Sequence, residues 1–262
     1  MSKSSKHIYA CGCSFTQKNW FKPQSNKKIG GWPMWPEILG KHLNLPAVNL
    51  AKGGMGNDYI LAISMKYILE NYKNIELVVI AWSQASRYML YDKHHFNPSV
   101  WLEGDPQDWN TETGNPGYRH YENPYSYSQF LMNHINSRGE LNTLASRYVR
   151  HVYTLQKLCE VLNVKYVFAG ALQPLQLYEW RQLDNFDEKK ELQHFTQVDN
   201  FYDINIANTI GWPFQKELGG KTLTSSDDFV PFGKNRVNND PHPDENGQRI
   251  IAQQYIDHYE KR

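Results

Sequence analysis

The chain has 262 residues, and its 28 lysines and arginines nearly balance its 27 aspartates and glutamates, for a formal net charge of +1. This length suits one large domain or two small ones. The charge balance argues against a domain built mainly to hold nucleic acid, which carries a basic excess. The longest apolar run, Leu77–Trp82, has six residues, whereas a membrane-spanning helix needs about 20, so we expect no membrane partner. No basic segment followed by an apolar stretch opens the sequence, and we therefore expect cytoplasmic synthesis.

The first half of the chain alternates between strand-like and helix-like segments. Glu76–Trp82 is the clearest strand, because its nearly continuous apolar residues are typical of a strand covered on both faces of a parallel sheet. Before it, apolar periodicity and glycine positions predict four further elements. They are a strand at His7–Cys13, a helix at Pro36–Leu43, a strand at Ala47–Ala51 and a helix at Asp58–Tyr72.

The second half contains two long stretches without a sustained period. Residues 91–140 are rich in Pro, Gly, Asn, His and aromatics, and such segments often form lids or binding loops. A second irregular stretch covers 172–239. Between and after them we expect a helix at Leu141–Leu162, a strand at Lys165–Gly170 and a final helix at Asp244–Tyr259.

This order of elements predicts an α/β fold with a parallel sheet of about five strands. We expect a single domain spanning 1–262, with the two irregular stretches as long decorated connections. Aromatic residues make up 14% of the chain, and many lie in these stretches. They either line a groove for a flat ligand such as a sugar or cover a core beneath long loops.

The three cysteines, Cys11, Cys13 and Cys159, indicate a reducing compartment and no disulfide scaffold, because their number is low and odd. Cys11 and Cys13 form a C-x-C pair, which can bind metal. No second pair lies at zinc spacing, so we favour core packing and expect no metal site.

Polar and glycine residues follow the predicted strands, where ligands bind in a parallel α/β sheet. Ser14 follows the first strand, Gly53-Gly54-Met55-Gly56-Asn57 the second and Ser83-Gln84 the third, while Asp240-Pro241-His242-Pro243 precedes the last helix. A serine needs a base to become a nucleophile, histidine is the usual base near neutral pH, and a carboxylate orients it. Backbone amides of a glycine-rich loop can bind the resulting oxyanion.

Each of these residues also has a simpler interpretation. Ser14 can cap a turn, Asp240-Pro241 is a common turn element, His242 is one of ten histidines, and the glycines can simply shape a loop. Their joint order along the chain is what favours a catalytic site.

At these residues the sequence resembles the SGNH (GDSL-like) hydrolase superfamily. The family has conserved sequence blocks, and Gly12-Cys13-Ser14-Phe15-Thr16 is similar to the first of them. The segment Asn49–Asn57 is similar to the second block, and Asp240-Pro241-His242-Pro243 with Gly247 is similar to the last. The resemblance implies a three-layer α/β/α, flavodoxin-like fold and ester hydrolysis or acyl transfer through a serine acyl-enzyme, without cofactor. It implies that Ser14 attacks, that His242 is the base oriented by Asp240, and that the amides of Ser14 and Gly54 bind the oxyanion.

The sequence departs from the family pattern in two places. The third block is usually G-x-N-D, but here Ser83 stands at the position of the asparagine that donates to the oxyanion, followed by Gln84. The family aspartate often lies three residues before the histidine, where this chain has Asn239, and Asp240 lies two before. We expect Ser83 or Gln84 to act as the remaining donor.

Three further residues are candidates for substrate contact: Trp82, Arg87 and Asn57. Arg87 can bind a polar or anionic group or tie down the following insertion. Trp82, with Trp20 and Trp32, can form an aromatic wall near Ser14 or serve only in packing.

Two classes of function remain in competition. The first is an esterase that removes a small acyl group, such as an O-acetyl group of a carbohydrate. The second is a non-catalytic glycan-binding or structural protein on the same fold, which the altered third block favours. A nucleotide-binding protein is a weaker third, because the loop around Gly54 lacks the G-x-G-x-x-G spacing. The abundance of Asn, Lys and Tyr is typical of an AT-rich genome, such as a viral one.

Overall fold

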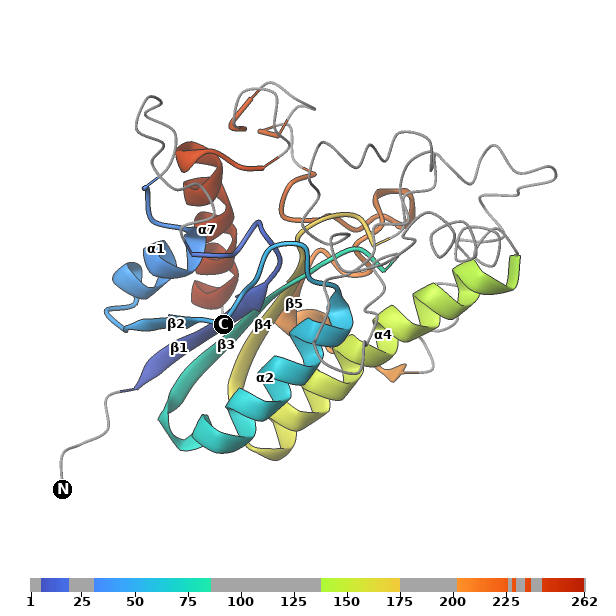
Figure 1. Cartoon of the computed structure of the whole chain (residues 1–262), viewed down its shortest axis with the longest axis horizontal. Helices are drawn as coiled ribbons and strands as arrows, with labels where there is room; N and C mark the ends of the chain where they lie inside the picture. The colour runs from blue at the N-terminus through green and yellow to red at the C-terminus, as the bar shows by residue number, and fades with distance from the viewer. Residues whose placement is uncertain are drawn as a thin grey trace, which may run out of the picture.

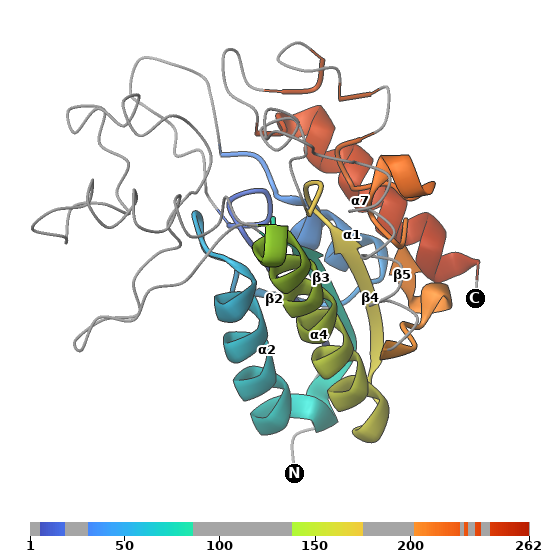
Figure 2. The same cartoon turned by 90° about the vertical axis from the view of Figure 1, so that its right-hand side faces the viewer.

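The structure is a computed structural model that describes residues 6–18, 31–85, 138–174, 202–225, 228–229, 234–236 and 242–261. Most of the predicted lid at 91–140 and much of the irregular stretch at 172–239 lie outside these residues. In the described part, one sheet carries helices on both faces, as Figures 1 and 2 show from two sides.

Five parallel strands form the sheet in the order β2-β1-β3-β4-β5, which confirms the predicted flavodoxin-like α/β class. The chain runs outward from β1 to β2, then returns to the other side of β1 with β3. Ligands bind outside the carboxyl ends of strands at such a reversal. The strands are β1 His7–Gly12, β2 Ala47–Asn49, β3 Ile75–Trp82, β4 Lys165–Gly170 and β5 Thr209–Ile210.

The two faces of the sheet are covered by different pairs of helices (Figure 2). Helices α1 (Trp35–His42) and α7 (Glu245–Glu260) pack together on one face. Helices α2 (Asn57–Asn71) and α4 (Arg138–Val161) pack on the other. Single 3₁₀ turns occupy Tyr72–Asn74, Ile206–Asn208 and Lys216–Leu218.

Alternating residues of the central strands fill two separate cores, as the period of two in a strand requires. In β3, Leu77 and Val79 belong to the core under α1 and α7, while Val78 and Ile80 belong to the core under α2 and α4. Both faces of β1 and β3 are therefore apolar, which explains why their sequences are continuous apolar runs.

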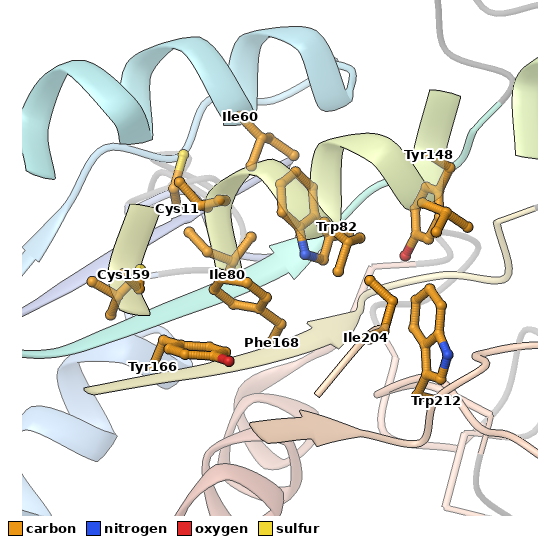
Figure 3. Close-up of a cluster of buried hydrophobic side chains, with 14 of the residues drawn as sticks. Cys11, Ile60, Ile80, Trp82, Tyr148, Cys159, Tyr166, Phe168, Ile204 and Trp212 are labelled. Carbon is orange, nitrogen blue, oxygen red and sulfur yellow. The ribbon is translucent and has the colours of Figure 1, made fainter. Parts of the chain in front are cut away.

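The core under α2 and α4 is rich in aromatic rings (Figure 3). Trp82, the last residue of β3, is fully buried there, with its ring centre 5.9 Å from Phe168 and 6.5 Å from Tyr148 in edge-on arrangements. This environment corresponds to the packing alternative for Trp82. The three cysteines are buried free thiols, with Cys11 and Cys13 in opposite cores.

The predicted strands and helices of the described residues are confirmed to within three residues at each end. β5 was not predicted, because its two residues leave no detectable pattern. Within the described residues, no group of three or more potential ligands is placed to hold a metal ion. No helix of the described part is long and apolar enough to cross a membrane.

Candidate active site

Ser14 lies in a tight turn directly after β1. The amides of Thr16 and Gln17 both donate to the carbonyl of Cys13 at 3.0 Å. The turn folds back against β3, and a side chain at Gly12 would place its Cβ 2.4 Å from Thr16 Oγ1 and 3.0 Å from the carbonyl oxygen of Ala81. Only glycine fits this close approach, so Gly12 is what lets the chain place Ser14 at the carboxyl end of the sheet.

His242 contacts Ser14, although the two residues lie near opposite ends of the sequence. It lies just before α7, 228 residues along the chain, and its Nε2 is 2.6 Å from Ser14 Oγ. The ring of Phe15 packs against the histidine ring at 4.9 Å between centres. In the tautomer that leaves Nε2 unprotonated, the serine hydroxyl donates to it. A hydroxyl bonded to an imidazole in this way can lose its proton as it attacks.

Side chains from three other elements hold the serine turn in place. Asn49 at the end of β2 donates from Nδ2 to the carbonyl of Thr16 at 2.7 Å. Trp35 of α1 donates from Nε1 to Thr16 Oγ1 at 3.3 Å. Gln248 of α7 donates to the carbonyl of Phe15 at 3.4 Å. Ser14 is thus fixed by both helices of one face and by the neighbouring strand.

The glycine-rich loop after β2 lies beside the serine turn. The amide of Gly53 donates to the side-chain oxygen of Gln17, and Asn49 Oδ1 accepts from the amide of Ala51 at 3.0 Å. Gly54 has a φ of +75° with open space where a Cβ would be. Its glycine identity therefore serves the left-handed backbone conformation.

The third predicted segment, Ser83-Gln84, is buried at the end of β3. In the described part of the chain, Ser83 Oγ and Gln84 Oε1 have no hydrogen-bond partner. The side chain of Asn57 binds the backbone here, with Nδ2 donating to the carbonyls of Ser83 (3.0 Å) and Gln84 (3.1 Å) and Oδ1 accepting from the Ser83 amide (2.8 Å). Asn57 therefore faces the end of β3. Asp240 and Arg87 lie outside the described residues.

An open hollow of about 510 Å³ lies at the start of α7, two residues along the chain from His242. Its wall combines an indole with carboxylate, amide and guanidinium groups, from Trp32, Asp244, Glu245, Asn246 and Arg249. Asp244 caps α7 by accepting from the amide of Gly247 at 2.8 Å. Only Trp32 of this set was predicted near the site, because the other four belong to an ordinary helix start in the sequence.

An ionic cluster that the sequence did not reveal lies at the N-terminal end of α2. Asp58 pairs with Arg147 and lies 3.4 Å from His151 Nε2, both on α4. Burial lowers the pKa of His151 to about 4, against the opposing influence of the Asp58 carboxylate. The cluster joins α4 to the turn of α2 that carries Asn57.

The comparisons with known proteins concern the fold alone. No family model matches the chain, and no curated protein matches its sequence. Structural neighbours across the full chain are SGNH hydrolases and esterases at low identity. A protein described as an SGNH hydrolase, from Slackia heliotrinireducens, is 15% identical with a TM-score of 0.43, covering 97% of this chain and 99% of its own. An esterase from Pseudoalteromonas sp. is 12% identical with a TM-score of 0.43, covering 98% of each chain. An acetyl xylan esterase is 11% identical with a TM-score of 0.41, covering 96% of this chain and 98% of its own.

Proposed function

We propose that the protein is a serine esterase of SGNH type that forms an acyl-enzyme on Ser14. The observation that carries this proposal is the 2.6 Å contact between Ser14 Oγ and His242 Nε2. A serine hydroxyl is a weak nucleophile unless a base lies within hydrogen-bond reach. Side chains of β2, α1 and α7 anchor the serine turn, so the nucleophile is placed before substrate arrives.

In the proposed reaction His242 takes the hydroxyl proton as Ser14 attacks the acyl carbon. The imidazolium then gives this proton to the departing alkoxide, and the acyl group remains on Ser14 Oγ. A water molecule, deprotonated by His242, then attacks the acyl carbon of the acyl-enzyme. The bond between this carbon and Ser14 Oγ breaks, His242 returns the proton to Ser14 Oγ, and the carboxylic acid is released. Asp240 is assigned the orienting carboxylate, and no cofactor takes part.

The negative oxygen of the tetrahedral intermediate needs donors aimed at it. We assign this role to the amides of Ser14 and Gly54, with the side chain of Ser83 or Gln84 as the third donor. The burial of Ser83 Oγ without a partner in the described structure supports its part in this set. One such donor typically contributes about 2.7–4 kcal/mol to transition-state stabilisation. The turnover rate should therefore depend strongly on how well Ser83 or Gln84 donates.

The hollow at the start of α7 favours an acylated carbohydrate as substrate. An indole face packs against the apolar face of a sugar ring, while carboxylate, amide and guanidinium groups hydrogen-bond its hydroxyls. Trp32, Asp244, Asn246 and Arg249 offer this combination in one hollow, and Asp244 of this set lies two residues after His242 along the chain. We propose an O-acyl sugar as the ester, bound by a single domain that spans 1–262.

A fluorophosphonate probe tests the proposal, because it reacts only with an activated serine. We expect mass spectrometry to find the adduct on Ser14, and we expect Ser14→Ala and His242→Ala to abolish it. His258→Ala is the matched control, since this half-buried histidine of α7 bonds the carbonyl of Ala207 at 3.0 Å, away from Ser14. All variants are checked for an unchanged melting temperature.

The absence of an adduct on folded wild-type protein would overturn the proposal. It would favour the alternative, a non-catalytic glycan-binding or structural protein. Ser14 is only 3% exposed, and a binding protein has no need to expose it. Glycan binding that survives Ser14→Ala would then identify the alternative.

A further inference from the structure

We infer that Asn57 is a positioning residue that sets the third oxyanion donor by clamping the backbone of Ser83 and Gln84. This inference rests on the proposed function, and it replaces the predicted contact of Asn57 with substrate. In this arrangement the side chain of Asn57 connects the glycine-rich loop to the end of β3.

The clamp forms hydrogen bonds with backbone groups that lie beyond the paired part of β3. The pairing of β3 with β1 ends at Ala81, and its pairing with β4 ends at Trp82. Ser83 is fully buried beyond both ladders, so its amide and carbonyl would otherwise lack strand partners. Asn57 accepts from this amide and donates to this carbonyl, as a neighbouring strand would, and its second hydrogen reaches the carbonyl of Gln84.

The clamp is itself held from behind. Asn57 is the first residue of α2 and is 4% exposed. The next residue, Asp58, is fixed to α4 through Arg147 and His151. On the far side of the segment, the amide of Ala85 donates to the carbonyl of Pro174 at 2.7 Å. Residues 83–85 are therefore fastened at both ends, with the side chains of Ser83 and Gln84 left for another task.

That task follows from their unused polar atoms. A buried hydroxyl without a partner costs free energy unless something binds it. Ser83 Oγ is such a group in the described structure, at the strand end next to the one that carries Ser14. A donor in this position contributes only when its backbone holds still, because a displacement of about 1 Å can cost about 100-fold in rate.

The first measurement tests the clamp without any activity. Amide hydrogen exchange is followed by mass spectrometry on peptides covering 80–85 in the wild type, Asn57→Ala and Asn71→Ala. Asn71 is the matched control, because it lies at the other end of α2 and donates from Nδ2 to the carbonyl of Tyr67 at 2.9 Å. We expect exchange in 80–85 to rise at least ~10-fold in Asn57→Ala and to stay unchanged in Asn71→Ala. Unchanged exchange in Asn57→Ala would overturn the clamp.

The second measurement tests its effect on the reaction, using turnover of a p-nitrophenyl ester. We expect kcat to fall about 10- to 100-fold in Asn57→Ala with little change in KM. In Ser83→Ala, which removes the donor itself, kcat should fall about 100- to 1000-fold. The double variant should be no slower than Ser83→Ala, because both changes act on the same donor. Asn57→Asp is the second variant, for use if Asn57→Ala is too unstable to assay. It keeps the acceptor for the Ser83 amide but turns a carboxylate toward two carbonyls, so its kcat should also fall.

The outcomes separate this inference from the proposed function. A wild type without turnover or fluorophosphonate adduct contradicts the proposed function, and the exchange experiment still decides the clamp. If the wild type is active and the losses of kcat in Asn57→Ala and Ser83→Ala add independently in the double variant, the positioning role is overturned. An Asn57→Ala variant with the wild-type kcat also overturns it.

Discussion

Gln248 of α7 offers a sharp test of how the serine turn is held. Its side chain is 1% exposed, its Oε1 accepts from the amide of Trp35 at 3.0 Å, and its Nε2 donates to the carbonyl of Phe15 at 3.4 Å. Trp35 is the first residue of α1, so its amide has no partner inside the helix. The substitution Gln248→Met keeps the length and volume of the side chain and removes both hydrogen bonds.

The expected loss of stability can be worked from these two contacts. A buried amide left without a partner costs about 1–3 kcal/mol. The longer bond to Phe15 contributes about 0.5 kcal/mol, near the lower limit for a hydrogen bond. A swap of similar volume adds less than about 1.5 kcal/mol of packing strain. We therefore expect Gln248→Met to lower the free energy of unfolding by about 1.5–5 kcal/mol.

Urea unfolding followed by tryptophan fluorescence measures this loss from the midpoint at constant slope. Gln253→Met is the control on the same helix, because Gln253 is exposed and donates to the side chain of Asp257. Its effect should stay within about 0.5 kcal/mol. Equal stability of the two variants would refute the claim that Gln248 holds α1 and the serine turn together.

Two further predictions concern buried titratable groups. Because burial lowers the pKa of His151 to about 4 from about 6.5 in an unfolded chain, stability present above pH 6.5 should be lost at about 1.4 kcal/mol per pH unit as the pH falls toward 4. Urea unfolding at several pH values should show a weaker pH dependence in His151→Gln, and an identical dependence would contradict the assignment. Burial also raises the pKa of Cys11 to about 11, so iodoacetamide at pH 8 should modify this thiol in urea but not in the folded protein. Mass spectrometry checks this, and a modified Cys11 in the native state would count against it.

The sheet could be predicted because its signals are local. β4 was predicted with its observed bounds, Lys165–Gly170, and β3 differs only by including Ile75. Both are apolar runs buried on two faces, and such runs stand out in a sequence. β5 has only two residues, held by pairing of Phe168 and Ala169 with Thr209 and Ile210. Its existence depends on this tertiary contact, which no sequence pattern records.

The site could be predicted only in part for a related reason. Ser14 and His242 were predicted together from the order of elements, and the structure brings them into contact. The supporting residues were missed because no motif indicated which residues they would contact, as with Gln248 and Trp35, which are 213 residues apart. Asn57 was assigned to substrate because an amide at a glycine-rich loop fits either role. Only its three bonds to the end of β3 distinguish them.

The 228-residue separation of Ser14 and His242 has a consequence for synthesis of the protein. At a translation rate of about 5–20 residues per second, ~10–50 s pass between the two residues leaving the ribosomal catalytic centre. During that interval the nascent chain carries a serine without its base. Contacts of such long range also form late, because closing a long loop is entropically costly. Reaction with a fluorophosphonate should thus report completion of the whole fold, and chains released before His242 should remain unlabelled even when β1 and β3 have already paired.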